Sequence, residues 1–110
     1  MIRKVQLTSR AQHDVDEIVQ WLHNRSPQGA SSWYRRWKEI LTQLKASADK
    51  SALAPESADH DEAIRHVMFR TRRGKSYRAL FVVRRHDVWI LHVRGPGQDF
   101  MAPDEIHLPP

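Results

Sequence analysis

Three short segments within residues 64–94 constrain the fold of this chain more than any other part of its sequence. Each is rich in β-branched, aromatic and aliphatic residues and ends at turn-forming residues, a pattern that predicts β-strands. We place the strands at residues 64–70, 77–84 and 88–94. The links between them, residues 72–75 and 85–87, are short, so consecutive strands should pair as antiparallel hairpins.

Two amphipathic helices are expected before these strands. Apolar residues recur at helical spacing from residue 9 to about 24–26, and again from about 30 to about 48. Ser9, followed by Gln12 at capping-box spacing, predicts the N-cap of the first helix, and Pro27 predicts its end. The short link between the two segments implies an antiparallel helical hairpin.

Two tryptophans in the second helix, Trp33 and Trp37, could be mistaken for a platform on which nucleic-acid bases stack. They share a helix face with Ile40, Leu41 and Leu44. We therefore expect both indole rings in the hydrophobic core.

The order of the elements predicts the fold class. A first strand is expected at residues 2–7, where Val5 and Leu7 alternate with polar neighbours. The order β-α-α-β-β-β then predicts an α+β domain, with the helical hairpin packed on one face of a small, mainly antiparallel sheet. A chain of 110 residues suits one domain, which we expect over residues 1–98, followed by a C-terminal tail at residues 99–110.

Composition excludes several kinds of site. The chain has no cysteine, and therefore no disulfide, thiolate zinc site or thiol nucleophile. His60, Asp61 and Glu62 lie in a polar segment, residues 49–62, that we expect to be a solvated loop without metal-ligand spacing. We expect neither a metal nor an organic cofactor. Because no apolar run has the length of a membrane span or a signal peptide, we expect a cytoplasmic protein without membrane contacts.

Positive charge is concentrated in the predicted strands. The formal net charge is +5, yet residues 65–94 hold nine Lys and Arg and a single acid, Asp87, so the rest of the chain is net acidic. Clustered guanidinium groups repel one another and are costly to bury without partners. The cluster therefore predicts an anionic partner: nucleic acid, an acidic protein or a membrane surface.

Alternation along the strands assigns the arginines to faces of the sheet. Tyr77 and Phe81 should face the helices, which would point Arg78 to an open face. Our hypothesis is that Arg65, Arg78, His92 and Arg94 lie on or at the rim of one open surface, as a phosphate-binding patch with a titratable histidine in reach.

A structural alternative stands beside this hypothesis. Arg65 and Arg78 could instead pair with acids of the preceding loop, such as Glu56, Asp61 and Glu62. We expect His92 to be a half-buried histidine of the sheet rather than a general base. If Arg65 and Arg78 lie on opposite faces of the sheet, the single patch does not exist.

The chain also resembles the RelE/ParE toxin superfamily over roughly residues 7–94. The resemblance rests on the order of the elements and on a Tyr-Arg-x-Leu-Phe strand that leads through a hairpin into Ile-Leu-His-Val-Arg. The matching motifs are Ala11…Asp14…Glu17-Ile18…Trp21-Leu22, Trp33…Ile40-Leu41…Leu44, Ala54-Pro55-Glu56, Ile64-Arg65, Tyr77-Arg78-Ala79-Leu80-Phe81-Val82-Val83 and Ile90-Leu91-His92-Val93-Arg94. The resemblance implies the toxin of a type II toxin–antitoxin, or plasmid stabilisation, module. It also implies a small acidic antitoxin that wraps the helical hairpin and the sheet.

Members of this superfamily act in two ways. RelE-like toxins are ribosome-dependent mRNA endoribonucleases, and Arg78 matches the arginine that they carry in the Tyr-Arg strand. The catalytic set implied here would be Arg78, Arg94, Arg65 and His92, with positive charge stabilising the phosphoryl transition state. ParE-like toxins instead inhibit DNA gyrase by binding it.

Two departures favour the ParE-like, non-catalytic interpretation. RelE-type nucleases follow the last strand with a basic segment and a tyrosine, and residues 95–101 contain neither. The loop before Ile64 is acidic where theirs carries lysines. A RelE-like nuclease, with the ribosome as its site of action, and a non-toxic basic nucleic-acid-binding module are the alternatives.

Overall fold

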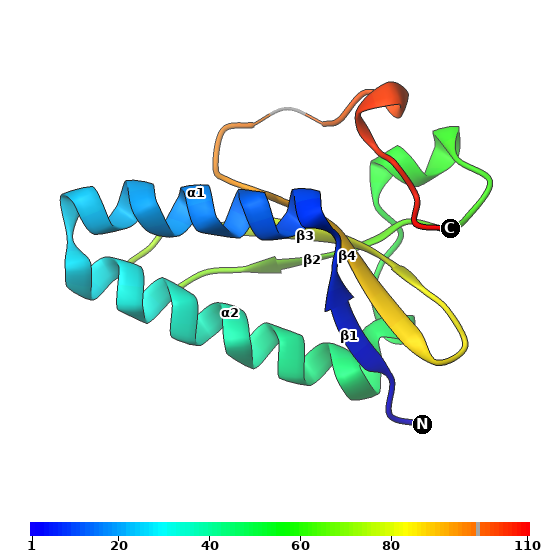
Figure 1. Ribbon diagram of the computed structural model, residues 1–110, viewed down its shortest axis with the longest axis horizontal. Coiled ribbons are helices and arrows are strands. Elements are labelled where there is room, and N and C mark those ends of the chain that lie inside the picture. Colours follow the sequence, from blue (N-terminus) through cyan, green and yellow to red (C-terminus); the bar gives the residue numbers. More distant parts are fainter. Residues whose placement is uncertain (99) are drawn as a thin grey trace.

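The computed structural model describes residues 1–98 and 100–110 and confirms the predicted order of elements. Strand β1 (Lys4–Leu7) precedes helices α1 (Ser9–Arg25) and α2 (Pro27–Ser47), and strands β2 (Arg65–Phe69), β3 (Tyr77–Val83) and β4 (Asp87–Arg94) follow. Short 3-10 turns occur at Ala48–Lys50, Pro55–Asp59 and Pro103–Glu105. The two helices lie side by side as a hairpin against one face of the sheet (Figure 1).

The sheet is mainly antiparallel, as predicted, with strand order β1-β4-β3-β2. Only β1 pairs in parallel, and its partner is β4. A bulge interrupts the pairing of β3 with β4, because Leu80 lies opposite His92 whereas Phe81 lies opposite Ile90. Leu91 is thus the extra residue, and the alternation of faces along β4 shifts after it.

Both helices begin at residues other than those predicted. The N-cap of α1 is Thr8 rather than Ser9, because the Thr8 backbone is extended and its hydroxyl accepts a hydrogen bond of 3.1 Å from the Ala11 amide. Helix α2 begins at Pro27, since Ser26 caps it by accepting from the Gly29 amide. Proline suits this first position because its missing N–H would have no partner inside the helix.

An aromatic cluster fills the core between the helices and the sheet. Trp33 and Trp37 stack with ring centroids 6.1 Å apart, and each is only 2% exposed. Phe69 and Tyr77, from the sheet, pack against Trp33. The prediction that the two tryptophans belong to the core is confirmed.

The second face of the sheet is covered, and the prediction of an open face is wrong. A second apolar cluster lies on this face. Residues 54 and 64 contribute to it from the segment before β2. Residues 100–110, which we call the C-terminal strap, cover it from the other side. Its buried members are Ala54, Ile64, Leu80, Val82, Leu91, Met101 and Ile106. Burying each large aliphatic side chain contributes about 1.5–3 kcal/mol, so leaving this face in water would be costly.

The strap runs beside the segment that precedes β2. It lies at the end of the molecule away from the turn that joins α1 to α2 (Figure 1). Asp99, where the predicted tail begins, lies outside the described residues. Among the residues that the structure describes, no helix is both long and apolar enough to cross a membrane.

Candidate functional site

A groove of about 1460 Å³ opens between the helical hairpin, the β2–β3 loop and the residues that follow β4. We call it the hairpin groove. Apolar side chains from both helices and the sheet line it: Ile18, Trp21, Leu22, Trp33, Tyr77 and Val93. Cationic side chains surround them: Arg10, Arg35, Arg36, Arg70, Arg72, Arg73, Lys75 and Arg94. The groove therefore combines an aromatic and aliphatic surface with a basic rim.

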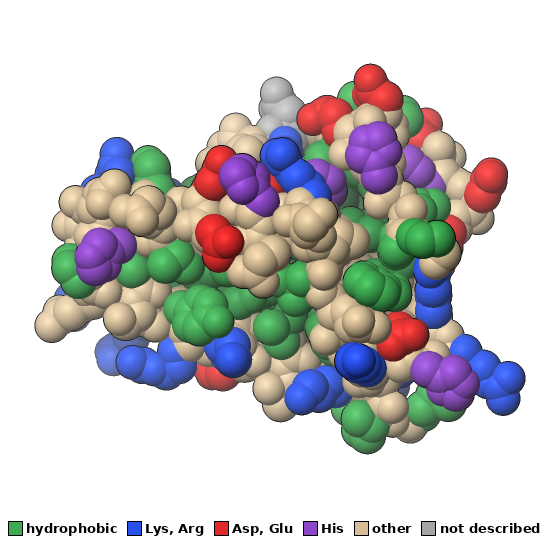
Figure 2. All heavy atoms as spheres, in the orientation of Figure 1, with side chains coloured by type: hydrophobic (Ala, Val, Ile, Leu, Met, Phe, Trp, Pro, Cys, Tyr) green, Lys and Arg blue, Asp and Glu red, His purple; other side chains and the backbone are tan. Residues whose placement is uncertain are grey.

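The charge balance of the hairpin groove is strongly positive. Its eight Lys and Arg side chains face three acids, Asp14, Glu17 and Glu39. Asp14 lies 3.3 Å from Arg10 Nε, and Glu39 lies 3.9 Å from Arg36. Figure 2 shows hydrophobic side chains between the two helices and Lys and Arg side chains along the outer edge of α2.

One aromatic residue of the groove is open to solvent. Trp21 is 53% exposed, and the guanidinium of Arg25 stacks on its ring at 3.6 Å from the centroid. A large exposed aromatic beside a basic rim is the composition of a protein-binding surface.

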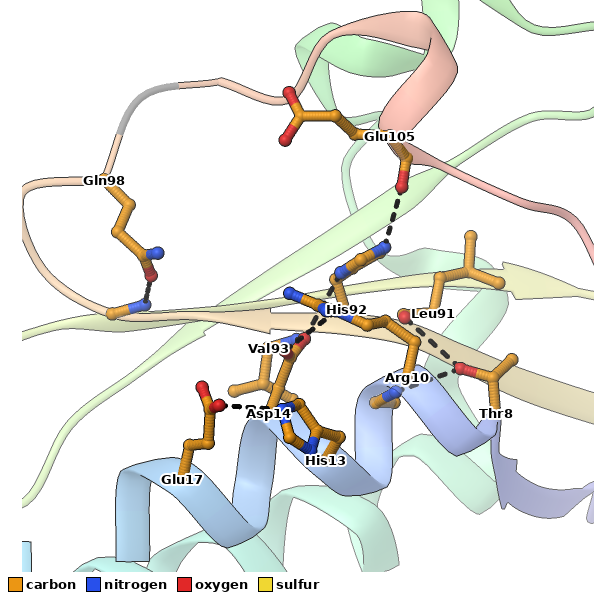
Figure 3. Close-up of polar contacts among 12 residues, drawn as sticks. Thr8, Arg10, His13, Asp14, Glu17, Leu91, His92, Val93, Gln98 and Glu105 are labelled. Carbon is orange, nitrogen blue, oxygen red and sulfur yellow. Dashed lines mark hydrogen bonds and ion pairs between the residues drawn. The ribbon is translucent and has the colours of Figure 1, made fainter. Parts of the chain in front are cut away.

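A polar network joins α1, β4 and the strap next to this groove (Figure 3). The pairing of β1 with β4 ends at Leu7 and Ile90, and α1 takes over along the rest of the β4 edge. Asp14 Oδ2 accepts a hydrogen bond of 3.0 Å from the Val93 amide, and the Thr8 hydroxyl donates to the Leu91 carbonyl at 3.3 Å. The carboxylate and the hydroxyl replace the missing strand partner.

His92 lies at the centre of this network and is buried, with 5% exposure. Its Nδ1 is 3.2 Å from Asp14 Oδ2, and its Nε2 is 3.1 Å from the Glu105 carbonyl oxygen. Both ring nitrogens form contacts inside the molecule. The His92 side chain is therefore more buried than the half-buried position that we expected.

Arg78 forms a buried, two-pronged pair with Glu56 from the loop before β2. The guanidinium NH1 lies 2.8 Å from Oε1, and NH2 lies 2.6 Å from Oε2. Glu56 is 3% exposed and Arg78 is 8% exposed. The alternative prediction, that Arg78 pairs with a loop acid, is confirmed.

Three hydrogen bonds keep the Glu56 carboxylate ionised. Burial on its own would raise the pKa of Glu56, but the Arg78 bonds and one from the Met101 amide, at 3.1 Å, outweigh it. The net effect lowers the Glu56 pKa from 4.5 to about 2.

Sequence reasoning missed a histidine in the same cluster. His66 Nδ1 lies 3.3 Å from Arg78 NH1. Burial and then the Arg78 charge lower the His66 pKa, while the Glu56 charge partly opposes them. His66 lies on the Arg78 side of the sheet because it pairs with Leu80. That placement can be known only once the register of β2 against β3 is known.

The single open patch proposed from the sequence does not exist. Arg65 lies opposite Phe81, whose ring belongs to the helix-side core, whereas Arg78 lies opposite Met68 on the other face. Arg65 donates to the Ser51 carbonyl rather than to a loop acid. The two arginines fall on opposite faces because β2 and β3 pair in a register that gives their positions opposite parity.

The bulge changes the placement of the β4 residues. Strict alternation along β4 would place His92 and Arg94 on the face of Val88 and Ile90, but they lie opposite Leu80 and Arg78. Arg78 and Arg94 are therefore neighbours across two strands, and only Arg94 also lines the hairpin groove. The catalytic roles of Arg78, Arg94, Arg65 and His92 stay predictions.

Arg84, which follows β3, holds the end of the strap. Arg84 pairs with both carboxylate oxygens of Glu62 at 3.1 Å and donates to the Pro109 and Pro110 carbonyls. This pairing raises the Arg84 pKa above its usual value. Among the described residues, no group of three His, Asp or Glu side chains is placed to hold a metal ion.

Comparison with known proteins identifies the fold. No family model matches the chain, and no curated protein matches it in sequence. Its structure is similar to a chain of the "Chromosomal ParDE TA system from P. aeruginosa", with a TM-score of 0.62 and 20% identity. The similarity covers 84% of this chain and 95% of the matched chain. The chain therefore shares its α+β fold with a chain of that ParDE system.

Proposed function

We propose that this protein is the toxin of a type II toxin–antitoxin module, ParE-like in action, which binds a cellular target and is neutralised by an acidic antitoxin. Two findings support this proposal. The fold is shared with a chain of a ParDE system. The hairpin groove has the basic rim and apolar lining that an acidic, amphipathic protein segment would require.

The hairpin groove is the observation that carries the proposal. Exposed ion pairs contribute only about 0.2–1 kcal/mol each, so the rim cations would chiefly steer an acidic partner and select it. Aromatic residues buried on binding contribute more, and Trp21, which is 53% exposed, is suited to that part. A segment with acids flanking apolar side chains would satisfy both parts of the groove.

The buried arginine favours binding over catalysis. A ribonuclease of the RelE kind needs accessible cations and a group that moves protons. Arg78 is paired with Glu56, and His92 is engaged at both ring nitrogens. DNA gyrase is the target that the resemblance suggests, which would place the protein in the cytoplasm.

Controlled expression would test this function. Induced without its antitoxin, the protein should arrest growth, with DNA replication falling before protein synthesis in pulse-labelling. Purified protein should inhibit supercoiling by gyrase, and its acidic antitoxin should relieve the inhibition.

Other outcomes would favour the alternatives. An early collapse of translation with cleavage of ribosome-bound mRNA would support the RelE-like nuclease instead. Unaffected growth, together with binding to nucleic acid, would support the non-toxic module.

A further inference from the structure

The Glu56 carboxylate is enclosed by donors from separate parts of the chain. Arg78 comes from β3 and occupies both carboxylate oxygens. The Met101 amide, from the strap, donates to Oε2 as a third bond. Phe100 covers the guanidinium, with its ring centroid 5.3 Å from Arg78 Cζ. A charged fork, a backbone N–H and an aromatic cover are the elements of a binding site for a small anion.

We propose that this is an anion-binding site and that Glu56 is its internal ligand, which fastens the strap to the second face of the sheet and withholds Arg78 from any external phosphate or carboxylate. The carboxylate comes from the turn Pro55–Asp59, separate in sequence from both β3 and the strap. It thus connects the turn to both β3 and the strap. Strap docking and the occupation of Arg78 are two consequences of the same contact.

A second arginine–carboxylate pair on the same side of the protein shows what sets this site apart. Arg84 and Glu62 also form two hydrogen bonds, but their side chains are 29% and 30% exposed. The strap carbonyls there bind Arg84 directly, so Glu62 is not the group that connects the strap to the sheet. Removing Glu62 would leave water to replace it, whereas removing Glu56 would leave the buried Arg78 charge and the Met101 amide without their acceptor.

The low pKa of Glu56 agrees with this assignment. A carboxyl group whose pKa is lowered to about 2 is ionised at neutral pH. The contact therefore needs no change of protonation to form.

The proposal is tested with Glu56→Ala, and with Glu62→Ala as the matched control. Hydrogen exchange of the strap amides and the melting temperature would be measured with increasing sodium acetate and, separately, inorganic phosphate. In Glu56→Ala the strap should exchange faster by roughly tenfold or more, because hydrogen bonds to charged groups are among the stronger ones. Acetate should restore protection and raise the melting temperature of Glu56→Ala, with no such effect on the wild type or on Glu62→Ala at equal ionic strength.

Two results would overturn the proposal. One is strap exchange in Glu56→Ala equal to that of the wild type. The other is an acetate or phosphate response no larger than that of Glu62→Ala. Should Glu56→Ala fail to fold, Glu56→Gln replaces it, because the amide keeps the size and one acceptor oxygen but loses the charge. Unchanged strap exchange in Glu56→Gln would count equally against the internal ligand.

A double variant tests whether the anion response needs Arg78. Glu56→Leu with Arg78→Met replaces the buried pair by apolar side chains of similar size, a change that buried ion pairs often tolerate. Because this variant has no guanidinium at the site, neither acetate nor phosphate should raise its melting temperature. An anion response equal to that of Glu56→Ala would show that the anion binds elsewhere and would overturn the proposal.

Discussion

Asp14 Oδ2 lies 3.2 Å from Nδ1 of His92 and joins the first helix to the last strand where β1 no longer reaches. The same oxygen accepts from the Val93 amide. One carboxylate thus satisfies a buried side chain and a buried backbone donor. The edge of β4 is closed by a helix residue instead of a strand.

Asp14→Ala should therefore destabilise the fold by about 2–4 kcal/mol, because it leaves the Val93 amide and the His92 ring without an acceptor in a buried site. Chemical denaturation would measure the loss. Asp16→Ala is the control, since Asp16 is exposed on the same helix and its carboxylate accepts only from Gln12 among the described contacts. Equal effects of the two substitutions would contradict the importance of the β4 edge contact.

Substitutions of Trp33 and Trp21, which both line the hairpin groove, should have different effects on stability and on binding. Trp33→Ala removes a 2% exposed ring from the aromatic cluster and should cost about 3–5 kcal/mol of stability. Trp21→Ala should change stability by less than about 1 kcal/mol, since its ring is 53% exposed, yet weaken binding of the acidic partner by about tenfold or more. Thermal denaturation and titration calorimetry would measure the two effects. A stable Trp21→Ala protein with unchanged affinity would place the partner elsewhere.

The elements of this fold could be predicted because their signals are local. Helical periodicity gave both helices, and the spacing of Trp33, Trp37 and Ile40 on one face indicated the core. Strand composition gave β2, β3 and β4 within a few residues. The N-cap of α1 lies one residue before the predicted position. Thr8 and Ser9 are both residue types that cap helices, and only the backbone conformation shows which of them is the cap.

The site was harder to predict because it depends on strand register and on contacts distant in sequence. Whether Arg65 shares a face with Arg78 is decided by the pairing of β2 with β3, and a shift of one residue would reverse the answer. The bulge at Leu91 then changes which β4 residues share a face, so that His92 lies opposite Leu80, on the Arg78 side, and no longer on the face of Ile90. Met101 and Ile106 lie in a segment without periodicity, so nothing local predicted that they would cover the sheet.

The rim of the hairpin groove should control how fast an acidic partner binds. Arg72→Glu with Arg73→Glu reverses two exposed charges of the β2–β3 loop and should slow association by roughly tenfold or more at low salt. The difference should shrink as salt screens the charges. Arg85→Glu is the control, because Arg85 is an exposed cation in the β3–β4 hairpin outside the groove. Surface plasmon resonance at several salt concentrations would measure the rates, and a slower rate only in Arg85→Glu would reject the groove.

Stability should fall in two steps as the pH is lowered. Burial lowers the His66 pKa from 6.5 in the folded state, so below that value the unfolded chain binds more protons and unfolding becomes easier. Glu56 has a folded pKa of about 2 against 4.5, so its contribution, on the order of 3 kcal/mol, is present above 4.5 and is lost as the pH falls toward 2. Urea denaturation from pH 7 to pH 2.5 would measure both steps. Glu56→Gln should flatten the acid step, and His66→Gln should flatten the step just below pH 6.5. An acid step that persists unchanged in Glu56→Gln would mean that other carboxylates cause it.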